Sequence, residues 1–269
     1  MIPAAFDYVR AGSVDEAVAL LGEHGEDAKL LAGGHSLLPM MKLRFAFPSV
    51  LIDIGHIADG SYVRVEGDEV AIGALTRHVE LVRSAVLAAE APLIAKVAAY
   101  VGDPQIRHRG TIGGSVAHAD PAADLPAAVL ASDATIVVQG PGGRRSIGAA
   151  EFFQGYFETA MTPDEMLVEL RVPRTGPAGA HYEKFTRRAN DWAIVAVATV
   201  AGRVAMANMG GAPLRAEATE AALLDGASIE DAAALAAEGT TPVEDMHADA
   251  GYRQHLARVL TRRALAAAS

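Results

Sequence analysis

Cysteine is absent from the 269-residue sequence. Its absence excludes disulfide bonds, thiolate zinc sites, cysteine nucleophiles and iron–sulfur clusters ligated by this chain. Any redox chemistry of the chain therefore needs a bound organic cofactor. Basic side chains are also in the minority, because 23 Lys and Arg face 33 Asp and Glu and leave a net charge of −10. Since nucleic acids bind clustered basic surfaces, we expect no nucleic-acid partner.

Long hydrophobic runs are missing as well. The most apolar stretch, 193–202, reaches about half the length that crosses a membrane before Arg203 interrupts it. The first 13 residues contain neither the basic nor the apolar region of a secretory signal. We therefore expect a cytoplasmic protein with no transmembrane segment. The length favours about two domains with sizeable cores.

The pattern of apolar residues predicts an α+β protein. Ser13 is a good helix N-cap, and Glu16 completes a capping box. Helices are expected over 76–100, beginning at Thr76 and restarting at Pro92, over 125–132 and through the alanine-rich C-terminal part. Short apolar runs predict strands at 29–32, 50–54, 70–72, 135–138, 167–172, 192–200 and 204–209. Residues 102–115 carry four glycines and a proline and show no periodicity, which predicts a structured loop. The composition of 173–179 predicts a linker.

Two glycine pairs each follow a short apolar run, in Ala32-Gly33-Gly34-His35-Ser36 and in Thr111-Ile112-Gly113-Gly114-Ser115. Consecutive glycines let the backbone turn with positive φ, approach a ligand closely and expose N–H groups to an anion. One such pair is commonly a tight turn, but two of the same form can hold a pyrophosphate between them. The sequence has neither GxGxxG nor GxxxxGK[ST], so a nucleotide would not be held by a Rossmann fingerprint or a P-loop.

Charged side chains surround the second pair and leave several interpretations open. His118, Asp120 and Asp124 are possible ligands of a hard metal, although a carboxylate near a dinucleotide more often accepts hydrogen bonds from a ribose. Arg107 and Arg109 are either solvated surface charges or groups that contact a ligand or a partner.

Two further residues near the glycine pairs and the expected linker have open roles. His35 lacks the spacing of a Ser–His–Asp triad, so its expected role is in the geometry of its loop. Trp192 is the only tryptophan and either packs in a core or stacks on an aromatic cofactor ring.

Three stretches, 32–44, 107–131 and 155–173, resemble the FAD-binding medium subunit of molybdenum-containing hydroxylases. The similarity is closest to the aerobic carbon monoxide dehydrogenase branch, more distant to the flavin domain of xanthine dehydrogenases, and covers essentially the whole chain. It implies a non-Rossmann FAD-binding domain over 1–173, with subdomains over about 1–56 and 57–173. A C-terminal flavoprotein domain over 174–269, with a three-stranded sheet and helices, would follow.

The resemblance also implies which residues contact FAD. The first glycine segment with Leu37 and Leu38 would wrap the pyrophosphate and flank the flavin, and the second segment would complete the pyrophosphate site. Trp192 would lie beside the isoalloxazine ring, Asp124 would bond a polar part of the cofactor, and Arg215 falls near a cationic contact. Val101 matches a position that is aromatic in xanthine dehydrogenases. The implied cofactor-binding residues are Ala32, Gly33, Gly34, His35, Ser36, Leu37, Leu38, Val101, Thr111, Ile112, Gly113, Gly114, Ser115, Asp124 and Trp192, with no catalytic residue and no metal ligand.

In that family the substrate is oxidised elsewhere. The resemblance implies a large subunit with a molybdenum cofactor, which oxidises the substrate, and a small subunit with [2Fe–2S] clusters. The small subunit would pass the electrons to FAD in this chain, and FAD would pass them to an external acceptor. It further implies that the three subunits form a dimer of heterotrimers. This chain would be cytoplasmic, and it would lie at the inner membrane face only as part of that complex. Three alternatives remain: a free-standing flavoenzyme of the same superfamily, such as an enolpyruvyl-sugar reductase or aryl-alcohol oxidase; a non-redox nucleotide-binding protein; and a metal-dependent hydrolase using His118, Asp120 and Asp124.

Overall fold

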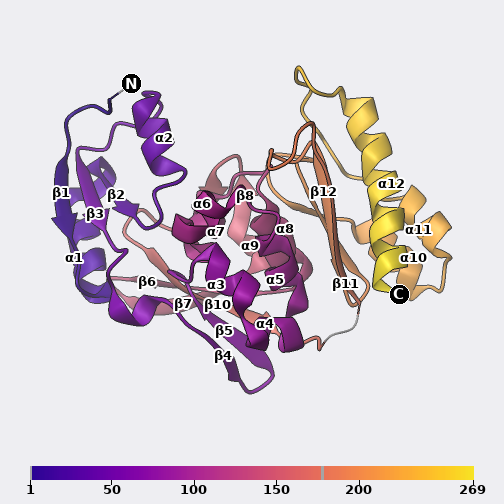
Figure 1. Cartoon of the computed structure of the whole chain (residues 1–269), viewed down its shortest axis with the longest axis horizontal. Helices are drawn as coiled ribbons and strands as arrows, with labels where there is room; N and C mark the ends of the chain where they lie inside the picture. The colour runs from indigo at the N-terminus through magenta and orange to yellow at the C-terminus, as the bar shows by residue number, and fades with distance from the viewer. Residues whose placement is uncertain (1, 177–178) are drawn as a thin grey trace.

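The computed structural model describes residues 2–176 and 179–269 and contains three units (Figure 1). The first unit is a parallel sheet in the order β1-β3-β2, formed by β1 (Asp7–Arg10), β3 (Val50–Asp53) and β2 (Ala28–Leu31). Its connections contain α1 (Val14–His24), the 3-10 turn η1 (Gly25–Asp27) and α2 (Leu37–Lys42). The predicted cap of α1 is confirmed, because Ser13 Oγ accepts the Glu16 N–H at 3.1 Å.

The middle unit is an antiparallel sheet in the order β4-β5-β10-β6-β7. Its strands are β4 (Val63–Glu66), β5 (Glu69–Gly73), β10 (Met166–Pro173), β6 (Thr135–Gly140) and β7 (Gly143–Gly148). Short helices pack on it around one large core: α3 (His78–Arg83), α4 (Ala85–Glu90), α5 (Pro92–Ala98), α6 (Pro104–Arg109), α7 (Ile112–His118) and α8 (Asp124–Ala131). The remaining elements are η2 (Ala58–Gly60), α9 (Ala149–Phe152), β8 (Phe153–Gly155) and β9 (Glu158–Thr159).

The predicted helix over 76–100 is three helices, and its start was misplaced. Arg77, not Thr76, is the N-cap of α3, because the Thr76 hydroxyl is engaged with the backbone of Tyr62 at 3.1 Å. Ser84 ends α3 and caps α4 through a 3.2 Å bond from the Leu87 N–H. Pro92 is the first residue of α5, a position where its missing N–H costs nothing.

The structured loop predicted over 102–115 contains two helices. Asp103 caps α6, which begins at Pro104, and Thr111 caps α7, in which Oγ1 accepts the Gly114 N–H at 3.2 Å. Glycine disfavours a helix interior by about 1 kcal/mol, so Gly113 and Gly114 concealed α7, while α6 has only six residues and shows no periodicity. Capping side chains and tertiary contacts overcome that preference.

The C-terminal unit is an antiparallel sheet in the order β11-β12-β13-β14. Three long strands, β11 (Ala180–Phe185), β12 (Val195–Val200) and β13 (Arg203–Ala207), are extended by the two-residue β14 (Leu214–Arg215). α12 (Ala250–Ala268) packs on it with α10 (Glu217–Leu224) and α11 (Ile229–Ala234), while α5 and α8 cover the other side. β11 was not predicted, and residues 177–178 of the predicted linker lie outside the described residues.

The apolar stretch 193–202 contains the central strand of this sheet. Every residue of β12 is buried, because helices lie on both of its faces. A strand buried on both sides has a continuous apolar sequence without alternation. Trp192 itself precedes β12, so the strand predicted from 192 begins three residues later. Among the helices of the described ranges, none has the length and apolarity needed to cross a membrane.

We expect Arg253→Ala to destabilise the C-terminal unit by about 2–3 kcal/mol. The Arg253 side chain is buried and donates to the Ile194 carbonyl at 2.5 Å and to the Asp245 carboxylate at 2.6 Å. Its removal leaves both acceptors without these hydrogen bonds. Urea unfolding measures the effect. Arg263→Ala on the exposed side of the same helix is the matched control, expected to change the free energy of unfolding by less than about 0.5 kcal/mol. Equal values for the two variants would contradict the prediction.

Candidate functional site

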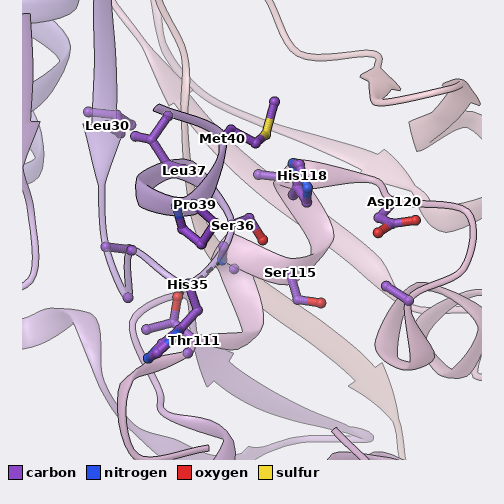
Figure 2. A pocket seen from close by; sticks show the side chains of 18 of the residues that line it. Leu30, His35, Ser36, Leu37, Pro39, Met40, Thr111, Ser115, His118 and Asp120 are labelled. Carbon is purple, nitrogen blue, oxygen red and sulfur yellow. Dashed lines mark hydrogen bonds between the residues drawn. The ribbon is translucent and has the colours of Figure 1, made fainter. Parts of the chain in front are cut away.

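One large cavity, of about 980 Å³, lies where the three units meet. The first unit contributes the chain around α2, the middle unit contributes α7 and its neighbours, and the C-terminal unit contributes the loop after β11. Figure 2 shows Ser36, Ser115, His118 and Asp120 around the same space. This volume is at the upper end of the range for small-molecule sites and suits an extended ligand.

The two glycine segments touch each other inside this cavity. A Cβ on Gly33 would lie 2.4 Å from the Arg109 carbonyl oxygen and 2.8 Å from the Gly110 Cα. No side chain fits into that gap, so the backbones of the two segments are in direct contact. Gly34 has a φ of +75°, which L side chains rarely adopt. Close approach therefore requires glycine at position 33, and backbone conformation favours it at 34.

The N–H groups of the first segment are available to a ligand. Across residues 2–176 and 179–269, no protein acceptor is bonded to the N–H of Gly33, Gly34, His35 or Ser36. Four successive amides without acceptors at the wall of a cavity form a cradle for an anion. This arrangement matches the prediction made from the sequence of this segment.

The second segment is arranged differently from the prediction. A short stretch, 74–78, runs antiparallel to it, and the Gly113 N–H donates to the Ala74 carbonyl at 2.8 Å while the Ile112 N–H donates to Thr76 at 3.0 Å. The N–H groups of Gly114 and Ser115 bond to Thr111 because α7 begins there. These amides are already used, so this segment is a rigid wall that offers the Ser115 hydroxyl.

Thirteen of the fifteen predicted site residues line the cavity, and two do not. Leu38 packs on the first segment, with Cδ1 2.9 Å from the place a Cβ on Gly34 would occupy. Ile112 is fully buried in the core of the middle unit. The lining members are Ala32, Gly33, Gly34, His35, Ser36, Leu37, Val101, Thr111, Gly113, Gly114, Ser115, Asp124 and Trp192.

A buried polar cluster joins the middle and C-terminal units at the cavity. Lys184 Nζ lies 2.9 Å from the Asp124 carboxylate, which also accepts a hydrogen bond from the Tyr182 hydroxyl. Burial raises the pKa of Asp124, and Lys184 and Tyr182 oppose that rise. Burial, together with Asp124, holds the pKa of Tyr182 well above its ordinary value. Lys184 lines the cavity and was missed, because nothing in the sequence brings β11 to α8.

Trp192 is not a core residue. It is 66 % exposed at the rim of the cavity, and its indole Nε1 donates to Asp120 at 3.2 Å. The metal interpretation loses its support, because Asp120 is bonded to Trp192 and Asp124 to Lys184. Within the described part of the chain, no group of three His, Asp or Glu side chains is arranged to hold a metal ion.

The arginines singled out from the sequence have structural partners. Arg107 donates to the backbone carbonyls of Ala99, Val101 and Gly102, at 2.9–3.2 Å, and so fixes the end of α5. Arg215 bonds Glu220 at 2.6 Å and Asp133 at 2.7 Å and is not among the lining residues, so its implied cofactor contact finds no support in the cavity. Arg109 is exposed, and its backbone carbonyl touches Gly33.

Comparison with known proteins defines the class as FAD-binding flavoproteins. Residues 4–175 match the family described as the FAD binding domain in molybdopterin dehydrogenase. Residues 180–268 match the CO dehydrogenase flavoprotein C-terminal domain. The chain therefore belongs to the molybdopterin-dehydrogenase flavoprotein family, and the resemblance noted from its sequence is confirmed.

Individual relatives are similar over the whole chain. The carbon monoxide dehydrogenase medium chain of Hydrogenophaga pseudoflava is 44 % identical, with 100 % of this chain and 98 % of the relative covered. A 6-hydroxypseudooxynicotine dehydrogenase complex subunit alpha from Paenarthrobacter nicotinovorans is 38 % identical, with 100 % and 96 % covered. The structure of carbon monoxide dehydrogenase from Hydrogenophaga pseudoflava lacking the Mo-pyranopterin moiety superposes with a TM-score of 0.96 at 46 % identity, covering 100 % and 98 %.

We expect Gly33→Val to abolish FAD retention, because its Cβ would push the two glycine segments apart. Flavin content per protein, read from the absorbance spectrum after gel filtration, measures the effect. Gly148→Val is the matched control, since a Cβ there meets nothing within 4 Å. The prediction fails if Gly33→Val folds and keeps the flavin content of the control.

Proposed function

We propose that this chain carries FAD in a molybdenum hydroxylase complex, as an electron-transfer subunit of the carbon monoxide dehydrogenase type. The observation that carries the proposal is the row of four free amides, Gly33 to Ser36, in a cavity closed by a second glycine segment. We further propose the domain division given above, with FAD-binding subdomains over about 1–56 and 57–173 and a C-terminal domain over 174–269.

The cofactor would supply the capacity to take up electrons singly and release them in pairs. The amides of the first segment would bind its pyrophosphate, with the Ser36 and Ser115 hydroxyls as additional donors. The Asp124–Lys184 pair would bond a polar part of the cofactor, and its fixed charges would tune the electrostatic field there. Val101 and Trp192 would contact the ring system. No side chain of this chain acts as an acid or base toward the substrate.

Two observations support partner subunits. The chain has no cysteine, so [2Fe–2S] clusters that pass electrons to it must belong to another chain. The segment after α2 also exposes large apolar side chains: Leu43 is 54 %, Phe45 75 % and Phe47 63 % exposed, and the two phenylalanines also belong to the cavity lining. Clustered exposed apolar side chains are typical of interaction surfaces. We propose a small [2Fe–2S] subunit and a large molybdenum subunit as partners, in a cytoplasmic dimer of heterotrimers.

The proposal is tested by co-producing the chain with the products of its neighbouring genes and purifying it through an affinity tag. We expect flavin absorbance in this chain and iron and molybdenum in co-purifying chains. Substrate turnover should appear only in the assembled complex. A colourless preparation would exclude the flavin role, and turnover by the chain alone would favour a free-standing flavoenzyme.

We expect Trp192→Ala to shift the flavin absorption maxima and to change the flavin reduction potential by about 10–30 mV. That range corresponds to the free energy of one aromatic contact. Trp192→Phe is the matched control, because it keeps an aromatic ring and loses the bond to Asp120. Spectroelectrochemistry measures both variants. If the alanine variant has the spectrum and potential of the parent, Trp192 does not contact the ring.

A further inference from the structure

His78 lies at the end of the backbone ladder that supports the second glycine segment. It is the first residue of α3, and it belongs to the cavity lining. Its N–H donates to the Gly110 carbonyl at 3.0 Å, next to the bond between Ile112 and Thr76. The residue is only 3 % exposed, so its ring is enclosed by the elements that shape the cavity.

The His78 ring is in contact with the segment that touches Gly33. A Cβ on Gly110 would lie 2.7 Å from both Cδ2 and Nε2 of the ring. A Cβ on Gly33, in turn, would lie 2.8 Å from the Gly110 Cα. The three residues therefore form a close-packed series, His78, Gly110 and Gly33.

We infer that His78 is a positioning residue of the cofactor cavity, whose ring holds the Gly110 peptide against Gly33 and thereby sets the distance between the two glycine segments. The inference rests on the proposed function, because it concerns the cavity proposed to hold FAD. His78 itself need not touch the cofactor, since it acts through Gly110.

The surroundings of the ring favour its uncharged form. Burial, with His35 and Arg107 nearby, lowers the pKa of His78 to about 4. Arg107 is held on the carbonyls at the end of α5 and cannot turn away freely. On its own helix, Glu80 accepts the Arg77 N–H and the Ser61 hydroxyl. Within the described ranges, Nδ1 of His78 is buried with no hydrogen-bond partner, so a charged ring would have no acceptor there.

The pH dependence follows from that environment. The pKa in the folded site is below the ordinary value of 6.5, so folding favours the neutral ring. The stabilising contribution is complete above about pH 6.5 and is lost as the pH falls toward about 4. Protonation would push the ring away from Arg107 and release Gly110. Cofactor binding should therefore weaken as the pH approaches about 4, where the ring in the folded cavity becomes charged.

The experiment uses the purified complex and measures free flavin by fluorescence of the filtrate, after equilibration at about pH 7 and about pH 4. We expect the parent to bind flavin about twofold more weakly at the lower pH, where about half of the His78 rings are charged. His78→Gln should remove this dependence, because the amide stays neutral at both values. His78→Ala should bind flavin about tenfold more weakly already at about pH 7, because a void replaces the ring.

His108→Gln is the matched control, since His108 is exposed on the neighbouring helix α6 and should leave the parental pH profile unchanged. If His78→Gln loses flavin with acid as steeply as the parent, the inference is overturned and the proposed function stands. If the parent complex holds no flavin at either pH, the proposed function fails and the inference with it. Because His78→Gln is judged by its pH profile, the test does not depend on the alanine variant folding.

Discussion

The contact between the backbones of Gly33 and Arg109–Gly110 is the constraint on which the site depends. The first segment leaves the end of β2 in the parallel sheet, whereas the second is anchored to the antiparallel sheet through 74–78. Their contact fixes two separately built units relative to each other. Because a side chain at position 33 would meet main-chain atoms that cannot rotate away, the gap tolerates only glycine.

The two glycine segments contribute differently to the site: the first offers free N–H groups, and the second forms a rigid wall. The 74–78 stretch accepts the N–H groups of Ile112 and Gly113, and formation of α7 uses those of Gly114 and Ser115, so the second segment is stiff and has no free N–H at 112–115 to donate to a ligand. The first segment is irregular between β2 and α2, and irregular backbone is what leaves amides free. A rigid wall facing a donor-rich loop presents a preorganised site, which lowers the ordering cost of binding an extended anion.

Short-range patterns in the sequence predicted much of this structure. Features that depend on contacts between distant segments could not be predicted from it. The Ser13 cap, the position of Pro92 and both glycine segments follow from short-range chemistry. The helix α7 was missed because Gly113 and Gly114 disfavour helix formation, and α6 because it is only six residues long; contacts from 74–78 stabilise both. Lys184 was missed because its role depends on pairing with Asp124, which lies 60 residues away in another unit of the fold. Most residues implied by the resemblance line one cavity, but the resemblance did not distinguish Ile112, which is buried in the core, from the lining.

The C-terminal unit completes the site by supplying a buried cation and an indole at the rim of the cavity. The walls from the first and middle units offer amides, hydroxyls and histidines, while Lys184 and Trp192 come from the loop and strand around β11. Asp124 is the first residue of α8, so Lys184 adds a cation beside a carboxylate already at a helix N-terminus. A buried carboxylate without that cation would favour protonation, as the direction of its pKa shift indicates. The ion pair therefore does two things at once: it keeps a charge in the cavity wall, and it ties the position of the β11–β12 loop, and with it Trp192, to the glycine segments.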